Sequence, residues 1–121
     1  MLEDTLNVES SPIPEHTGCF LVTLEGDLDS SNAQSVIKLV QNLSENEGLV
    51  HLVADFSKLR YINSTGLGAL LRISKTLISK RGSFKIANPN ENVFEVIEIV
   101  GANKLLSIYK TREEALESLQ D

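Results

Sequence analysis

The chain has 121 residues, of which 41% are hydrophobic, so a single domain with one buried core is expected over residues 1–121. The core must be mainly aliphatic, because aromatic residues make up only 5% of the chain. The net charge of −6 argues against nucleic acids and anionic membrane surfaces as partners, since both attract Lys and Arg.

The sequence also favours a cytoplasmic protein. Cys19 is the single cysteine, which excludes an internal disulfide and is typical of intracellular chains. The N-terminal run MLEDTLNVES has neither the basic nor the apolar part of a signal peptide. No apolar run approaches the ~18 residues that a membrane-spanning helix needs.

The N-terminal half predicts strands at Thr5–Glu9, Cys19–Leu24 and Leu49–Asp55. A serine- and proline-rich run follows the first of them and predicts a loop at 10–18. The second and third strands are almost wholly apolar, which is typical of strands covered on both faces. Gly26 is expected to end the second strand.

A helix is predicted between the second and third strands. Ser30 and Ser31 offer an N-cap, the helix runs to about Asn46, and Gly48 closes it. Its apolar stripe repeats at intervals of three and four residues and comprises Ala33, Val36, Ile37, Val40 and Leu43.

A longer helix is expected to begin with a cap at Asn63 or Ser64. Lys80 and Arg81 lie in its last turn, and Gly82 is a natural residue for the position after the helix. Its predicted apolar face comprises Leu67, Leu70, Leu71, Leu77 and Ile78.

The C-terminal third predicts strands at Ser83–Ala87 and Leu105–Tyr109, each followed by a helix. Asn88–Pro89 starts the first helix and Gly101 stops it, while Thr111 has capping-box spacing to Glu114 ahead of the second. The apolar residues are Val93, Ile97 and Val100 in the first helix and Ala115, Leu116 and Leu119 in the second. The alternation predicts an α/β fold with a mostly parallel sheet of about five strands and about four helices.

Residues that commonly carry catalysis or metals form no recognisable site in the sequence. His16 and His51 lack a second ligand at metal-binding spacing, and Cys19 begins an apolar strand. Gly66–Gly68 lacks the third glycine of a dinucleotide fingerprint, and Ser64 is not in a nucleophile elbow. We therefore expect neither an enzyme nor a cofactor.

The junction Tyr61–Gly68, with the sequence YINSTGLG, is unusual. It places an amide and two hydroxyls, Asn63–Thr65, at a helix N-terminus, where N–H groups and the positive end of the dipole favour a phosphate. Gly66 and Gly68 each lower helix stability by up to ~1 kcal/mol, so the close approach of another backbone or ligand would explain them. Simple helix capping by the amide or the first hydroxyl is the alternative.

An acidic run, Gly26–Asp29, follows the second strand. Loops at the carboxyl ends of parallel strands gather at one edge of the sheet, which predicts Asp29 near Asn63 and Ser64. A phosphate adds about −1.5 to −2 charges, and beside Asp27 and Asp29 these would repel a bound partner. A turn that caps the next helix is the alternative.

These residues resemble the STAS domain, the fold of bacterial anti-sigma-factor antagonists. Asn63–Gly68 is similar to the family's Asp-Ser-Ser/Thr-Gly-Leu-Gly run, and Gly26–Asp29 to its Gly-Glu-Leu-Asp element. Further similarities occur in the family's order at Asp55–Ser57, Tyr61–Ile62, Asn88–Pro89, Gly101, Ile108–Tyr109 and Glu113–Leu116. The resemblance covers roughly Val8 to Leu119 and implies one STAS domain with its core at about 6–119.

The resemblance implies a switch between protein partners, in which an anti-sigma factor that is a serine/threonine kinase phosphorylates Ser64 and then dissociates. A serine phosphatase would reset the switch, and ATP would belong to the kinase. Thr65 would shape the turn and Asp29 would be an acidic neighbour, on a docking face between Asp29 and Leu71. The other residues implied around the phosphorylation site are Asp27, Asn63, Gly66, Leu67 and Gly68.

Asn63 departs from the family pattern, which has Asp before the serine. The amide can still cap the helix, but one negative charge beside the phosphate acceptor is lost. Two other functions stay open: a STAS module of a sensory scaffold or transport-associated complex that is not phosphorylated, and a nucleotide hydrolase built on the same residues.

Overall fold

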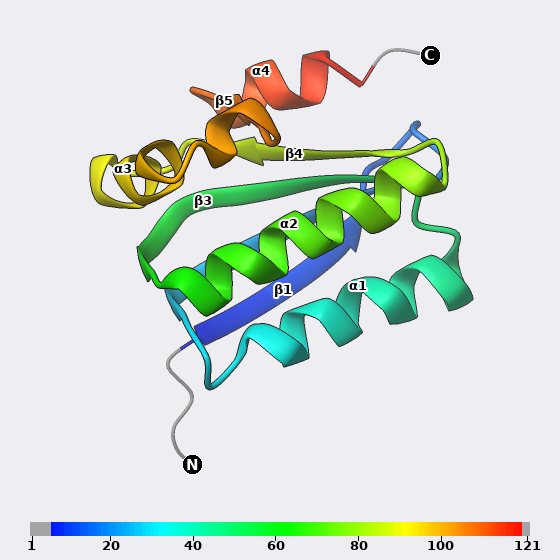
Figure 1. The fold of residues 1–121 in the computed structure, drawn as a ribbon. Coiled ribbons are helices and arrows are strands. Elements are labelled where there is room, and N and C mark those ends of the chain that lie inside the picture. The colour runs from blue at the N-terminus through cyan, green and yellow to red at the C-terminus, as the bar shows by residue number, and fades with distance from the viewer. Residues whose placement is uncertain (1–5, 120–121) are drawn as a thin grey trace.

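The computed structural model describes residues 6–119, which contain a five-stranded sheet, four α-helices and a short 3₁₀ helix (Figure 1). The strands are β1 (Leu6–Pro12), β2 (Cys19–Leu28), β3 (His51–Ile62), β4 (Ser83–Ala87) and β5 (Ser107–Tyr109), and they lie side by side in sequence order. β1 pairs antiparallel with β2, and the other neighbouring pairs are parallel. The predicted α/β fold with a mostly parallel sheet is confirmed.

The helices cover both faces of this sheet. They are α1 (Ala33–Glu47), α2 (Ser64–Ser79), α3 (Glu91–Ile99) and α4 (Arg112–Glu117), with the 3₁₀ helix η1 (Ala102–Lys104) after α3. Figure 1 shows α1 and α2 side by side across one face, while α4 packs on β3 and β4 from the other. Within residues 6–119, no helix combines the length and the apolar character that crossing a membrane requires.

β3 is the central strand of the sheet, and its position explains why the first half of its sequence is so apolar. Leu52, Ala54 and Phe56 belong to the large core beneath α1 and α2, whereas Val53 belongs to a smaller core with Ala115 of α4. Because β3 is covered on both faces, its residues do not alternate between apolar and polar. The aliphatic core predicted from composition is confirmed, since Phe20, Phe56 and Phe84 are its aromatic members.

The first three strands extend beyond their predicted ends, whereas the last begins at Ser107 and not at Leu105. Residues 10–12 are the end of β1 and not part of a loop, because they pair with β2 at the edge of the sheet, where a proline is tolerated. Gly26 does not end β2, which continues to Leu28 through two shifts in register with β3. β3 likewise continues past Asp55 to Ile62. Thr5, the predicted start of the first strand, lies outside the described residues.

Several helix ends differ from prediction by a residue or two. The N-cap residue of α1 is Asn32, not Ser30 or Ser31, and α3 begins at Glu91 with Asn90 as its cap. After α2, the left-handed conformation is adopted by Arg81 and not by Gly82. Gly82 instead passes so close to β3 that a Cβ would lie 1.7 Å from the carbonyl oxygen of Val50.

The predicted apolar stripes are confirmed except at two helix ends. All five predicted stripe residues of α1 are buried, as are Leu67, Leu70 and Leu77 of α2. Ile78 is 59% exposed and Val100 is 62% exposed, so both predictions were wrong. Ile78 lies in the last turn of α2, and Val100 is the C-cap residue of α3.

Candidate functional site

Asn63 joins the start of α2 to the end of β2. Its side-chain Oδ1 accepts a hydrogen bond from the Gly66 N–H at 2.9 Å, which makes it the N-cap of α2. Its own main-chain N–H donates to the carbonyl oxygen of Leu28 at 3.2 Å, and its Nδ2 donates to Ser30 Oγ at 3.5 Å. Of the two predicted caps, the structure therefore uses Asn63 and leaves Ser64 without a capping role.

Ser64 and Thr65 are the first two residues of α2, and both are exposed. Within residues 6–119, no hydrogen bond engages either side-chain hydroxyl. The first turn of α2 contains no acidic residue, so its N–H groups and dipole are not neutralised there. This arrangement can present a hydroxyl to another protein and stabilise a phosphate placed on it.

The two glycines of the junction differ in their surroundings. Gly66 is buried, and a Cβ there would lie 2.6 Å from the carbonyl oxygen of Leu28 and 3.0 Å from the Ile62 side chain. Gly68 is exposed, and a Cβ there would meet nothing within 4 Å. Internal packing thus explains Gly66 but not Gly68.

The acidic run lies at the same edge of the sheet as the junction. Asp27 is in β2 and forms an exposed ion pair with Arg60 at 3.3 Å. Asp29 accepts hydrogen bonds from the main-chain N–H and the hydroxyl of Ser31, at 2.9 and 2.6 Å, and so stabilises the turn before α1. The Asp29–Asn32 turn reaches Asn63 through Ser30, although no interaction joins Asp29 to Ser64 within residues 6–119.

Leu67 is the one predicted site residue whose side chain is buried in the core, where it is 5% exposed. It anchors α2 to the sheet and so supports the exposed residues around it. Across the described residues, no group of three or more His, Cys, Asp or Glu side chains is arranged to hold a metal ion.

A partly buried ion pair between Asp55 and Arg112 was not predicted from the sequence. The Asp55 side chain is 8% exposed, and its Oδ2 lies 2.7 Å from Nη2 and 2.9 Å from Nε of Arg112. Burial alone would raise the pKa of Asp55, but hydrogen bonds from Ser57 and Arg112 outweigh it and hold that pKa below its usual value. The pair joins α4 to the middle of β3. It could not be predicted from a local sequence pattern, because the partners are 57 residues apart.

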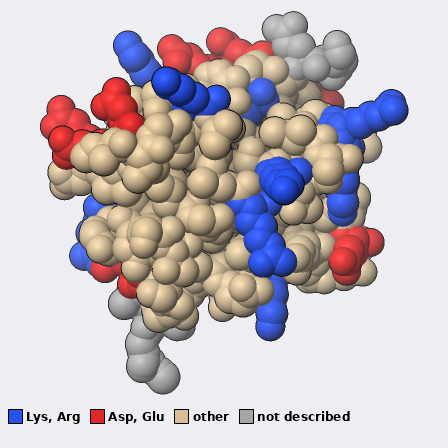
Figure 2. All heavy atoms as spheres, in the orientation of Figure 1, with Lys and Arg blue, Asp and Glu red and all other residues tan. Residues whose placement is uncertain are grey.

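The exposed surface of α2 is locally basic. Figure 2 shows a band of Lys and Arg crossing this face, with Asp and Glu mainly at its margins. α2 exposes Arg72 and Lys75 and contains no acidic residue, whereas α1 exposes Lys38 together with Glu45 and Glu47 at its C-terminal end. A partner that docks along α2 therefore meets positive charge, despite the net charge of −6.

A family model for the STAS domain matches residues 10–115 of this chain. The chain belongs to the STAS domain family. The match contains β2, β3, α2 and the junction at Asn63, so the family assignment covers both the fold and the candidate site.

Similar STAS proteins include named anti-sigma factor antagonists. An anti-sigma F factor antagonist of Paenibacillus polymyxa is 27% identical over 105 residues, which cover 87% of this chain and 90% of the relative. The crystal structure of an anti-sigma factor antagonist from Mycobacterium paratuberculosis superposes with a TM-score of 0.81 at 22% identity and covers 96% of this chain and 95% of that one. The Bacillus cell fate determinant SpoIIAA in its phosphorylated form has a TM-score of 0.69 at 18% identity, covering 95% of this chain and 99% of that one.

Proposed function

We propose that this STAS domain is an anti-sigma-factor antagonist whose binding to an anti-sigma factor kinase is controlled by phosphorylation of Ser64. The observation that carries the proposal is the exposed Ser64 hydroxyl at the N-terminus of α2, which no other described residue engages. The names of similar proteins support the antagonist role, and one structural neighbour was solved in a phosphorylated form.

The chain itself contributes position and charge to the proposed reaction. Ser64 Oγ would attack the γ-phosphorus of ATP bound to the kinase, a base on the kinase would take the hydroxyl proton, and ADP would leave. Asn63 holds the start of α2 against Leu28, so Ser64 is presented on a fixed backbone. Fixing the acceptor in this way lowers the entropic barrier to transfer.

The phosphate would weaken the complex without unfolding the helix that carries it. Its charge of about −1.5 to −2 lies at the positive end of the α2 dipole, where it is stabilised. It also lies at the same edge of the sheet as Asp29 and the Asp27–Arg60 pair, where the added negative charge repels an acidic partner surface. A phosphatase would restore binding.

Ser64→Ala is expected to abolish phosphate incorporation, because it removes the only proposed acceptor oxygen. Purified wild-type protein incubated with its cognate kinase and ATP should gain one phosphate by intact-mass measurement, and the variant none. The matched control is Thr65→Ala, which removes the neighbouring exposed hydroxyl and should still accept one phosphate. Incorporation that persists in Ser64→Ala, or that never occurs in the wild type, contradicts the proposal.

Asn63→Asp is expected to stabilise the fold by about 0.3–1 kcal/mol, because a carboxylate caps α2 as well as the amide does and adds a negative charge at the positive end of the dipole. Ser30 can donate its hydroxyl to the carboxylate, so the 3.5 Å link is kept. Urea denaturation measures the gain.

The same substitution is expected to speed phosphate transfer, since it restores the family's carboxylate beside the acceptor. Thr111→Asp is the control, because it adds one negative charge at the N-cap of α4 and should leave the transfer rate unchanged. Equal acceleration in both variants would show that the carboxylate acts through net charge and not through its position next to Ser64.

A STAS module that is not phosphorylated is the second candidate function, and Asn63 is the observation that favours it. A wild-type protein that binds its partner tightly but accepts no phosphate from any kinase encoded by an adjacent gene would support this candidate. The anti-sigma-factor role and the phosphorylation are thus tested by separate measurements.

A further inference from the structure

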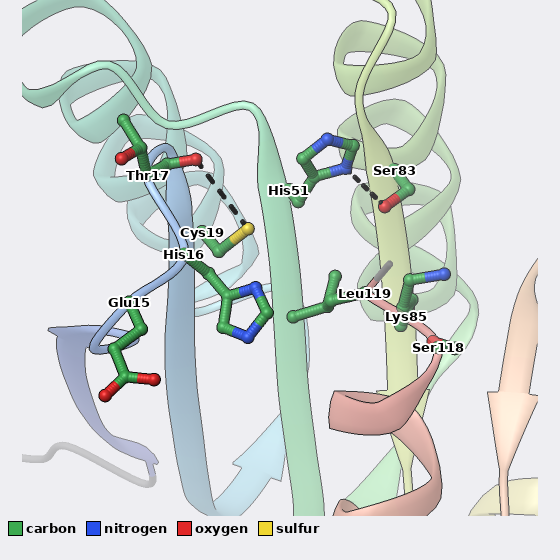
Figure 3. A pocket seen from close by; sticks show the side chains of 9 residues that line it. All are labelled: Glu15, His16, Thr17, Cys19, His51, Ser83, Lys85, Ser118 and Leu119. Carbon is green, nitrogen blue, oxygen red and sulfur yellow. Dashed lines mark hydrogen bonds between the residues drawn. The ribbon is translucent and has the colours of Figure 1, made fainter. Parts of the chain in front are cut away.

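A cavity of about 620 Å³ lies at the amino ends of β2, β3 and β4, at the opposite end of the strands from Ser64 (Figure 3). β3 begins at His51 in the wall of this cavity and ends at Ile62 beside the junction, so the two regions are roughly 30 Å apart. A volume of this size is typical of pockets that hold small molecules. The cavity is lined by Glu15, His16, Thr17, Cys19, His51, Ser83, Lys85, Ser118 and Leu119.

Main-chain hydrogen bonds fix three of the walls. The carbonyl oxygen of Gly18 accepts from the N–H groups of Val50 and His51 at 2.8 and 3.0 Å, which ties the loop before β2 to the start of β3. The Ser83 N–H donates to the Val50 carbonyl at 3.1 Å and ties the start of β4 to the same place. The cavity is therefore formed before any ligand enters.

Lys85 supplies a positive charge that has no local counter-charge. Its side chain is partly buried, and its Nζ lies 3.4 Å from the hydroxyl and 5.5 Å from the ring centre of Tyr109. No carboxylate of residues 6–119 lies within 4.0 Å of it. Among the described residues of the wall, Glu15 is the only acidic one, and it is exposed.

Other polar side chains line the same cavity. His51 Nδ1 and Ser83 Oγ are 2.8 Å apart, and Figure 3 shows this pair on the β3 and β4 side of the cavity. When Ser83 donates to Nδ1, the ring proton is on Nε2, which can then donate to a ligand. His16 and the Thr17 hydroxyl add further possible donors, whereas the Ser118 hydroxyl already donates to the carbonyl oxygen of Ala115 at 2.6 Å.

We propose that this cavity binds a small organic anion through its carboxylate or phosphate group. Lys85 and His51 would hold the charged group, because an ammonium and an N–H donor suit such oxygens, and Ser83 would hold the His51 ring in place. Leu119, which is 7% exposed, would contact the apolar part of the ligand. The site is separate from the proposed phosphorylation site and does not depend on it.

The experiment titrates the full chain with inorganic phosphate, acetate or adenosine monophosphate while the ring signals of His16 and His51 are followed by NMR. A saturable shift of the His51 signals is expected with at least one probe. Comparison of the phosphate and acetate titrations shows whether the cavity prefers a phosphate or a carboxylate group. Comparison of adenosine monophosphate with phosphate shows whether the nucleoside part of the ligand adds affinity. No saturable shift with any of the three overturns the proposal.

Lys85→Met should weaken this binding about tenfold or more, because a charge-assisted hydrogen bond is lost. Lys75→Met, on the exposed surface of α2, is the matched control and should bind as the wild type does. Ser83→Ala removes the partner of His51 without removing charge and should also weaken binding, which keeps the test valid if Lys85→Met does not fold. Unchanged affinity in folded Lys85→Met or in Ser83→Ala overturns the proposal, and Ser64→Ala should bind normally.

Discussion

Replacing Gly66 with alanine is expected to displace the start of α2 and to impair the Ser64 site. The new methyl group would lie 2.6 Å from the carbonyl oxygen of Leu28, which accepts the hydrogen bond from the Asn63 N–H. Relief of this overlap must push α2 away from β2 and lengthen that bond. We expect the free energy of unfolding to fall by about 1–3 kcal/mol, as in other overpacked sites, measured by urea denaturation.

Gly68→Ala is the matched control, because the same change is made two residues further along the same helix. A methyl group there meets nothing within 4 Å, so the better helix propensity of alanine should raise stability by about 0.5–1 kcal/mol. In the proposed function, the absence of a side chain at Gly68 allows the partner to approach the α2 backbone closely. Gly68→Ala should therefore be more stable and yet bind the kinase more weakly, while Gly66→Ala should lose both stability and phosphate incorporation. Equal stability of the two variants contradicts this account of the junction.

The two glycines also show what could not be predicted from the sequence alone. The pattern YINSTGLG was sufficient to place a helix N-terminus and to mark both glycines as unusual. It could not separate Gly66 from Gly68, because the difference depends on the Leu28 carbonyl, which a different strand brings to the junction. Likewise, the parallel-sheet rule placed the acidic run at this edge, but the turn that Asp29 forms with Ser31 depends on the local chain path.

The helices were predicted better than the strand ends for a related reason. The stripe of α1 repeats over several turns, so five residues reinforce one assignment. The extension of β2 and β3 beyond Gly26 and Asp55 arises from pairing between the two strands, with Leu28 opposite Ile62, and not from the composition of either segment. Ile78 and Val100 are exposed at helix ends although the apolar periodicity includes them, so periodicity alone does not show which terminal residues are buried.

Asp55→Ala is expected to lower the free energy of unfolding by about 2–3 kcal/mol at pH 7. The variant leaves Arg112 without its carboxylate partner and removes the acceptor of the Ser57 N–H, 2.9 Å away. The value lies below that for fully buried pairs, because the Arg112 side chain is 42% exposed and water can solvate it. Asp27→Asn is the control, since its ion pair with Arg60 is exposed and its loss should change stability by less than about 1 kcal/mol.

The pH dependence of this difference tests its electrostatic origin. Since the pKa of Asp55 is lower in the folded than in the unfolded chain, the folded chain binds fewer protons at this group, and the stabilising effect of the carboxylate is fully present above the ordinary value of 3.8. The effect is lost as the pH falls through the folded-state pKa. Urea denaturation of wild type and Asp55→Ala should therefore show a constant difference from about pH 5 to 8 and a smaller one below about pH 4. A difference that does not shrink in acid would mean that packing, and not the ion pair with Arg112, holds α4 against β3.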